Sequence, residues 1–293
     1  MNKKVINSIY QRNQVSITNS YFNNNILWHK LKAFFICIFL ISLLGCSKNE
    51  PEIIGKTSEF TISSSIVKDD YPISVYQSPL YTGSLSNELI VVLDGELRFK
   101  DIVSIISEKT ANGSIAPCLV VGIGNLKERN RDYTPTKYEY GKGGAETFYK
   151  FLKDELIPEL KSRYNIQSNQ KATLIGYSFG GLFVHYVMFQ NRNDNPFNKF
   201  ISGGCSFWYD SGVIFEYEKK YASNNTDLDV KFYSGMGSLE GGVSLGSFTE
   251  MTNRLKSRNY PRFQMKTETI KKHGHSDAAN NTFKNGLNYL YEN

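Results

Sequence analysis

The stretch KATLIGYSFGGLFVHY (171–186) carries a serine between two glycines, directly after a short apolar run. The apolar run is typical of a buried strand, and the segment after the serine has the apolar spacing of a helix. A G-x-S-x-G motif in this context is a sharp strand-to-helix turn that exposes the hydroxyl, and small flanking residues relieve backbone crowding. The turn predicts that Ser178 is a nucleophile, provided that the chain also supplies a base and an acid.

Three further apolar runs are also short and rich in β-forming residues, and each is followed by Gly, Asp or Ser. They are ELIVVLDG (88–95), APCLVVGIGN (116–125) and KFISGGCSF (199–207). Such β-rich runs suit strands that are buried on both faces of a parallel sheet. Segments with helical spacing lie between or beyond them, and two more strands follow. The helical segments are 99–113, 143–165, 180–191 and 282–293, and the strands are 229–237 and 263–272.

The alternation of strands and helices predicts an α/β fold with a mostly parallel central sheet flanked by helices. Two earlier segments, EFTISSSIV (59–67) and YPISVYQSP (71–79), alternate loosely in hydrophobicity. They predict antiparallel strands at the N-terminal edge of the sheet. We therefore expect one domain over residues 58–293.

The net charge of +6 does not indicate nucleic-acid binding. Residues 1–45 contain five basic residues and no acidic one, and the rest of the chain has 29 basic and 28 acidic residues. A nearly neutral body lacks the basic surface that nucleic-acid binding requires. The basic excess instead belongs to the segment that precedes the apolar run AFFICIFLISLL (33–44).

A basic region, a short apolar run and a small residue are the parts of an export signal. The sequence LLGC (43–46) resembles a bacterial lipobox, which implies cleavage before Cys46 and lipidation of its thiol. We expect a signal peptide over residues 1–45, with an unusually long Asn-rich start, and a polar tether over 46–57. An uncleaved anchor or a buried helix is the alternative. Ser47 is not an acidic residue, so we expect an anchor in the outer membrane of the cell envelope.

Two cysteines remain in the expected mature chain, Cys118 and Cys205, each in an apolar run. We expect both to be buried strand thiols. The sequence has no CxxC motif and no Cys/His spacing that binds zinc, so no metal or cofactor is predicted.

A serine needs a base, and the loop after strand 263–272 contains His273 and His275. In an α/β sheet this loop lies at the same edge as the Ser178 turn, because sites gather at the carboxyl ends of the strands. His185 lies in the helix after Ser178, and we expect it to be a packed or a surface histidine and not the base. An acid should precede the histidine in the chain, and Glu240 and Asp210 both stand in loops that follow strands. A Ser-His pair without an acid is the third alternative.

The ordered motifs resemble the esterase family of α/β hydrolases that includes esterase D and the enterochelin-type siderophore esterases. The motifs extend over most of residues 58–293. They are VVLDGE (91–96), VGIGN with RNRDYTP (121–135), GGAETFYKFLKDELIP (143–158), GYSFGGLF (176–183), CSFWYD (205–210), GSLEGG (237–242) and HSDAANNTFKNGL (275–287).

The resemblance implies that Ser178 is the nucleophile and that His275, which stands a set distance before a Gly-Leu pair, is the base. It implies that Glu240 is the acid. The N–H of Phe179 and one from Gly95 or Glu96 are the implied oxyanion donors.

The resemblance also suggests substrate contacts. Arg131 matches an Arg-Asp pair near the family's site, although a structural ion pair is an equal alternative. Tyr177 stands where the family often has His or Gly, and Trp208 stands in a segment that is richer in tryptophan elsewhere. With Phe207 and Tyr209, Trp208 is expected either to form a stacking wall or to join the core.

These observations together predict a lipid-anchored serine esterase for a small-molecule ester, with siderophore, glycan and small acyl esters all open. The oligomeric state is open as well. Two alternatives are a binding lipoprotein that keeps the fold without catalysis, and an acyltransferase that uses an acceptor other than water.

Overall fold

The computed structural model describes residues 53–291. The expected signal peptide, the expected lipidation site at Cys46 and most of the expected tether lie outside these residues. The first strand begins at Lys56, two residues before the domain boundary expected from the sequence. In the described range, no helix is long and apolar enough to cross a membrane.

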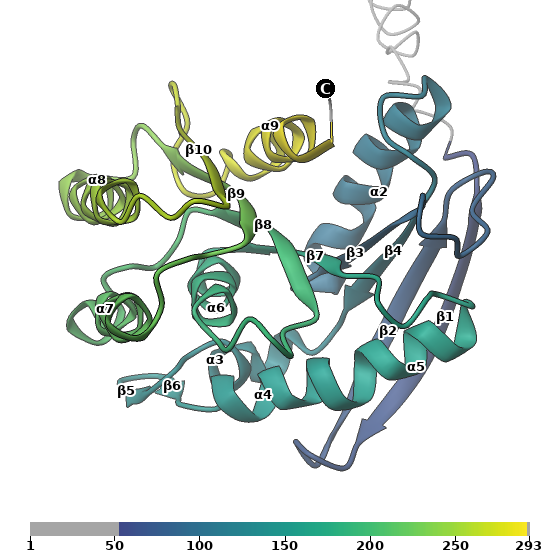
Figure 1. Ribbon diagram of the computed structural model, residues 1–293, viewed down its shortest axis with the longest axis horizontal. Coiled ribbons are helices and arrows are strands. Elements are labelled where there is room, and N and C mark those ends of the chain that lie inside the picture. Colours follow the sequence, from purple (N-terminus) through teal and green to yellow (C-terminus); the bar gives the residue numbers. More distant parts are fainter. Residues whose placement is uncertain (1–52, 292–293) are drawn as a thin grey trace, which may run out of the picture. The chain divides into compact units, whose positions relative to one another are not determined.

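Eight strands form the main sheet in the order β1-β2-β4-β3-β7-β8-β9-β10 (Figure 1). The strands β1 and β2 pair antiparallel, β2 is antiparallel to β4, and the other neighbours are parallel. The expected mostly parallel α/β sheet with antiparallel strands at its N-terminal edge is confirmed. The strands are β1 (Lys56–Ser64), β2 (Asp69–Gln77), β3 (Glu88–Val92), β4 (Cys118–Ile123), β7 (Ala172–Tyr177), β8 (Phe197–Gly203), β9 (Val230–Gly237) and β10 (Phe263–Ile270).

Helices cover both faces of this sheet (Figure 1). The helices α2 and α9 pack on one face, and α4, α5, α6, α7 and α8 contribute to the core on the other. The helices are α2 (Gly95–Ala111), α3 (Arg129–Asp132), α4 (Ala145–Phe151), α5 (Ile157–Arg163), α6 (Phe179–Met188), α7 (Ile214–Asn224), α8 (Gly242–Ser257) and α9 (Ala279–Tyr291). Short turns are η1 (Leu126–Glu128), η2 (Leu152–Leu156) and η3 (Tyr209–Gly212), and β5 (Lys137–Tyr138) pairs with β6 (Gly141–Lys142) in a small hairpin.

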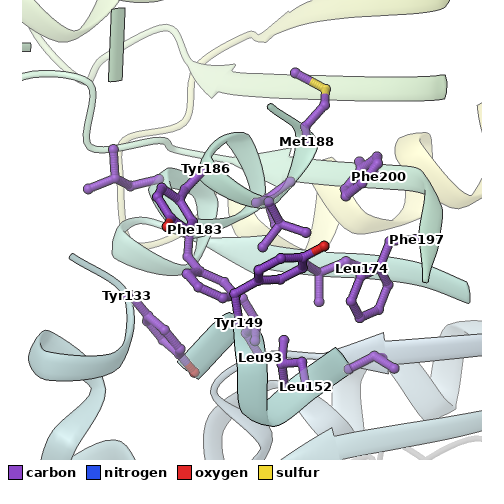
Figure 2. Packing of buried hydrophobic residues seen from close by; sticks show 14 of the residues in the cluster. Leu93, Tyr133, Tyr149, Leu152, Leu174, Phe183, Tyr186, Met188, Phe197 and Phe200 are labelled. Carbon is purple, nitrogen blue, oxygen red and sulfur yellow. The ribbon is translucent and has the colours of Figure 1, made fainter. Parts of the chain in front are cut away.

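The central strands can be located from the sequence, because their continuous apolar runs leave neither face suited to solvent. All residues of β4 and β7 are buried, as expected for strands covered by helices on both sides. Figure 2 shows one part of this core, where Tyr149 and Leu152 belong to the same cluster as Leu174 and Phe183. Three helices were not predicted: α3, which has only four residues, and α7 and α8, whose apolar positions are interrupted by many polar and small residues.

The two remaining cysteines are free and buried, as expected. Cys118 begins β4, whereas Cys205 lies just after β8 in the turn that follows it, so the expectation of two strand thiols is wrong for Cys205. The helix predicted over 143–165 is widened at η2 into a π-helical turn, directly before Pro158. Proline lacks the amide hydrogen that a regular helix would use, so a widened turn accommodates it.

Gly286 allows α9 to approach β8 closely. A Cβ at position 286 would lie 2.9 Å from two side-chain carbons of Ile201, which is fully buried. Gly286→Ala is therefore expected to lower the free energy of unfolding by about 1–3 kcal/mol through overpacking, measured by denaturant titration. The control is Gly246→Ala on α8, where nothing lies within 4 Å of the added Cβ. That change should raise stability by about 0.5–1 kcal/mol, and equal losses in both variants would contradict the close contact.

His185 is packed in the core, which is the first of the two expected alternatives, and contacts the rings of Phe207 and Phe232. Its Nδ1–H donates to the Gly181 carbonyl at 2.9 Å, and burial lowers its pKa from 6.5 to about 4. Between these two values the unfolded chain binds more protons than the folded one, so stability falls as the pH drops through this window. The loss attributable to this group between pH 7 and pH 5 is about 2 kcal/mol.

The measurement compares unfolding free energies at pH 7 and pH 5 for the wild type and His185→Gln. The variant should lose less stability on acidification than the wild type. His273→Gln, which changes a half-buried histidine outside the core, is the matched control and should keep the wild-type pH dependence. An unchanged dependence in His185→Gln would show that the buried imidazole does not titrate below its ordinary range.

Candidate active site

The site lies at the carboxyl ends of β3 and β7, which are neighbours at the centre of the sheet. The chain moves from β3 to β4 on one side and later from β7 to β8 on the other, so the strand order reverses here. Such a switch point leaves a crevice between the loops that follow the two strands. The turns at Asp94 and Ser178 therefore lie side by side.

Ser178 occupies a tight turn between β7 and α6. Its backbone has φ 60° and ψ −118°, a conformation that side-chain-bearing residues rarely adopt. The Ser178 N–H donates to the Gly203 carbonyl at 2.9 Å, and the Ser178 carbonyl accepts from Leu182 at 3.0 Å. Gly176 is required here because a Cβ at this position would lie 2.3 Å from the Gly180 carbonyl oxygen. The predicted strand, turn and helix are all present.

Ser178, His275 and Glu240 form one continuous chain of hydrogen bonds. The Ser178 Oγ lies 3.0 Å from His275 Nε2, and His275 Nδ1 lies 2.6 Å from Glu240 Oε2. The other carboxylate oxygen of Glu240 accepts from the Gly237 N–H at 2.9 Å. The Glu240 side chain is only 4% exposed, whereas that of His275 is 47% exposed. A buried carboxylate on Nδ1 keeps the proton there and leaves Nε2 free to accept from the serine hydroxyl.

The two rival residues lie elsewhere. His273 Nδ1–H donates to the Lys271 carbonyl at 2.7 Å, and Asn281 Nδ2 lies 3.0 Å from its Nε2. The Asp210 carboxylate accepts from the Thr136 hydroxyl at 2.5 Å. In the described part of the chain, neither rival forms a hydrogen bond to Ser178 or to His275, so the geometry favours His275 and Glu240.

Tyr177 does not face the crevice. The expectation that it contacts substrate is therefore wrong. The residue is 2% exposed and packs with Phe283 of α9. Its hydroxyl donates to the backbone carbonyl of His275 at 2.7 Å, and burial raises the pKa of this hydroxyl so that it stays protonated. The side chain next to the serine therefore holds the loop that carries the histidine.

Two helix N-termini converge beside the serine. The first-turn amides of α6, beginning at Phe179, and of α2, beginning at Gly95, have no partner within their own helices. The two turns are close, since a Cβ on Gly180 would lie 3.4 Å from the Asp94 carboxylate. The Glu96 side chain is engaged elsewhere, since its carboxylate accepts a hydrogen bond from the Asn125 N–H at 2.7 Å. Amides at helix N-termini stabilise negative charge, so this corner suits an oxyanion.

Arg131 is held in a structural network, which is the second of the two alternatives that the sequence left open. Its guanidinium donates to Asp132 at 2.7 Å and to Asp69 at 2.9 Å, and contacts the Tyr71 hydroxyl at 3.1 Å. The assignment of Arg131 to substrate binding is therefore not supported by its position.

Arg129 is the arginine nearer the site. It pairs with both oxygens of Asp94, at 2.7 and 2.9 Å, and its guanidinium lies 5.7 Å from the centre of the Phe179 ring. Because Asp94 is buried beside Gly180, the paired cation offsets a carboxylate charge that would oppose an oxyanion. Sequence reasoning missed Arg129, although it stands two residues before the predicted Arg131.

Aromatic side chains border the crevice. Trp208 is 40% exposed, and its ring lies 5.9 Å from Phe179 and 6.5 Å from Tyr140. Phe207 and Tyr209 are buried, so the expected cluster divides into an exposed tryptophan and two core residues. Tyr140, which is 51% exposed, comes from the β5–β6 hairpin and was not predicted. The only sequence signal for it is the alternation of tyrosines in KYEYGKG (137–143).

Metal ligation has no candidate in residues 53–291, because no three His, Cys, Asp or Glu side chains there are grouped to hold an ion.

Comparison with known proteins finds two relatives that are both named as esterases. The chain is 27% identical to the ferri-bacillibactin esterase BesA of Bacillus subtilis over 172 residues, which covers 50% of this chain and 58% of that protein. It is 25% identical to the siderophore triacetylfusarinine C esterase of Aspergillus fumigatus over 151 residues, covering 48% of this chain and 51% of that protein. The matched regions thus span little more than half of the curated relatives.

A crystal structure of the BES protein from Bacillus cereus has the same fold, with a TM-score of 0.73 at 22% identity. The match covers 84% of this chain and 98% of that one. The family model described as "Putative esterase" matches residues 63–284, which is most of the described domain. The chain therefore belongs to this esterase family and has the α/β-hydrolase fold.

Proposed function

We propose that this protein is a serine carboxylic-ester hydrolase that cleaves siderophore esters. The observation that carries the proposal is the hydrogen-bonded chain from Ser178 through His275 to the buried Glu240. A serine hydroxyl is a weak nucleophile at neutral pH, and an adjacent imidazole with an orienting acid is the arrangement that activates it.

The mechanism follows from the positions of the atoms. His275 Nε2 takes the proton of Ser178 as its Oγ attacks the ester carbonyl, and Glu240 stabilises the imidazolium. The N–H of Phe179 and one from the Gly95–Glu96 turn receive the oxyanion of the tetrahedral intermediate. His275 then gives its proton to the departing alcohol, and an acyl-enzyme remains. A water molecule, deprotonated by His275, hydrolyses it and restores the Ser178 hydroxyl.

The backbone at Ser178 supports this role. A non-glycine residue in such a conformation costs of the order of 1–3 kcal/mol, and strain of this kind is found where geometry serves function. The turn directs the hydroxyl toward His275 and leaves the Phe179 amide at the start of α6. The same geometry would serve acyl transfer to another alcohol, and product analysis with added acceptor alcohols distinguishes the two reactions.

Siderophore esters are the proposed substrate class because both curated relatives carry this activity in their names. The exposed Trp208 and Tyr140 beside the crevice offer faces on which a flat or ring-bearing group can stack. Lipid anchoring through Cys46 in the cell envelope, expected from the sequence, is part of the same proposal.

The main test measures hydrolysis of a 4-nitrophenyl ester and labelling by a fluorophosphonate probe. Ser178→Ala should abolish labelling, and His275→Ala should reduce hydrolysis at least about a hundredfold because it removes the general base. His273→Ala, two residues away, is the matched control and should change the rate little. Glu240→Gln should cost less than Ser178→Ala. If the wild type and Ser178→Ala react equally with the probe, or neither reacts, the proposal fails and a binding lipoprotein becomes the better explanation.

Tyr177→Phe tests the anchoring of the histidine loop. The change removes one hydrogen bond, from the tyrosine hydroxyl to the His275 carbonyl, and leaves the ring in place. We expect kcat to fall about tenfold with KM nearly unchanged, because the loss acts on the position of the base.

Tyr233→Phe is its matched control. Tyr233 is a buried tyrosine of β9, which β8 separates from the strand of Tyr177, and its hydroxyl donates to Glu268 at 2.8 Å. This control should lower stability without lowering kcat. Equal effects of the two variants on kcat would mean that Tyr177 acts only through general stability.

A further inference from the structure

A cavity of about 590 Å³ lies between η3 and the start of α7 on one side and α8 on the other. Its volume is within the range of pockets that bind small ligands. Figure 1 shows α7 and α8 as neighbouring helices at the same side of the sheet. The lining residues include Phe207, Trp208, Phe215, Glu216, Val243 and Glu250.

The cavity is connected to the proposed nucleophile through two short stretches of chain. Phe207 and Trp208 directly follow Ser206, whose Oγ lies 3.5 Å from the Ser178 Oγ. Val243 stands three residues after Glu240, in the first turn of α8. Both walls of the cavity therefore begin at residues that adjoin the Ser178 hydroxyl or the His275 ring.

The walls combine apolar and aromatic side chains with polar and charged ones. Phe207 and Phe215 lie with ring centres 6.0 Å apart, and the Arg254 guanidinium lies 4.8 Å from the centre of the Phe215 ring. Val243 is 74% exposed, and like Trp208 it is a large apolar side chain that borders this cavity. On α8, the lining positions Val243, Ser247, Glu250 and Arg254 recur at helical spacing, so one face of the helix forms a wall.

The charged groups of the lining are mostly carboxylates. Asp210, Glu216 and Glu250 contribute three negative charges against the single guanidinium of Arg254. Arg254 is already paired with Glu250 at 2.7 Å and lies 3.8 Å from Glu218. An anionic ligand group would meet an excess of negative charge here, whereas an uncharged or cationic group would not.

We propose that this cavity binds one arm of the ester that is cleaved at Ser178, and that it favours an uncharged or cationic arm with an apolar or aromatic part. The inference rests on the proposed hydrolase function, because it takes Ser178 as the point of cleavage. It extends that function by assigning a specificity site to α7 and α8.

The test fills the cavity with Val243→Trp and measures kcat/KM in two ester series. One series keeps 4-nitrophenol and changes the acyl group from acetyl to hexanoyl and 4-phenylbutanoyl. The other keeps acetate and changes the alcohol from ethanol to 4-phenylbutanol. In one of the two series, the rate ratio of the largest to the smallest ester should fall at least about tenfold relative to the wild type. The series that responds identifies the arm that the cavity binds.

Asn253→Trp is the matched control, since Asn253 is exposed on the same helix and does not line the cavity. This control should keep both wild-type ratios within about twofold. The proposal is overturned if Val243→Trp leaves both ratios within about twofold, or if Asn253→Trp changes them as much. A wild type that hydrolyses no ester and does not react with the fluorophosphonate probe would instead refute the hydrolase function itself.

The charge preference has its own test in the series that responds. An ester whose arm ends in a carboxylate, such as the adipate matched to the hexanoate, should be cleaved at least about threefold more slowly than its neutral counterpart. Glu216→Gln should reduce this difference because it removes one of the repelling charges. Equal rates for the two wild-type substrates, or a larger difference in Glu216→Gln, would contradict the proposed charge preference.

Discussion

The turn between β7 and α6 is the constraint on which the site depends. Ser178 holds a left-handed backbone conformation because the chain must leave a fully buried strand and enter a helix at once. This reversal is possible only because Gly176 leaves room for the Gly180 carbonyl, and because the Gly203 carbonyl accepts from the Ser178 N–H. The strain at one residue is offset by the hydrophobic core, in which α6 is buried along its whole length.

The other parts of the site come from distant segments of the chain that meet at the same edge of the sheet. Glu240 follows β9 and His275 follows β10, and parallel pairing of β8, β9 and β10 aligns their carboxyl ends. Tyr177 links two of these segments, since it precedes the serine and bonds the backbone of the histidine loop. The arrangement is rigid because each group has a second partner that fixes its direction: the Gly237 N–H for Glu240, and the Tyr177 hydroxyl for the His275 backbone.

The carboxylates and arginines around the crevice are paired with one another. Asp94 is buried next to the helix termini that would receive an oxyanion, and Arg129 pairs with both of its oxygens. Arg131 is similarly taken up by Asp132 and Asp69. The nearby arginines thus support the loops, while Trp208 and Tyr140 leave aromatic rings exposed beside the crevice.

The sequence by itself determined the fold class, the order of the central strands along the chain and the turn at Ser178, because these depend on local hydrophobic patterns and on glycine spacing. It also brought His275 and Glu240 into consideration, since loops after parallel strands share one edge. The roles of Tyr177, Arg129 and Tyr140, and the cavity between α7 and α8, were decided only by the tertiary structure. A side chain's neighbours depend on packing between segments far apart in the chain. Local sequence therefore cannot show that Tyr177 is buried under the His275 loop or that Arg131 is held by Asp69.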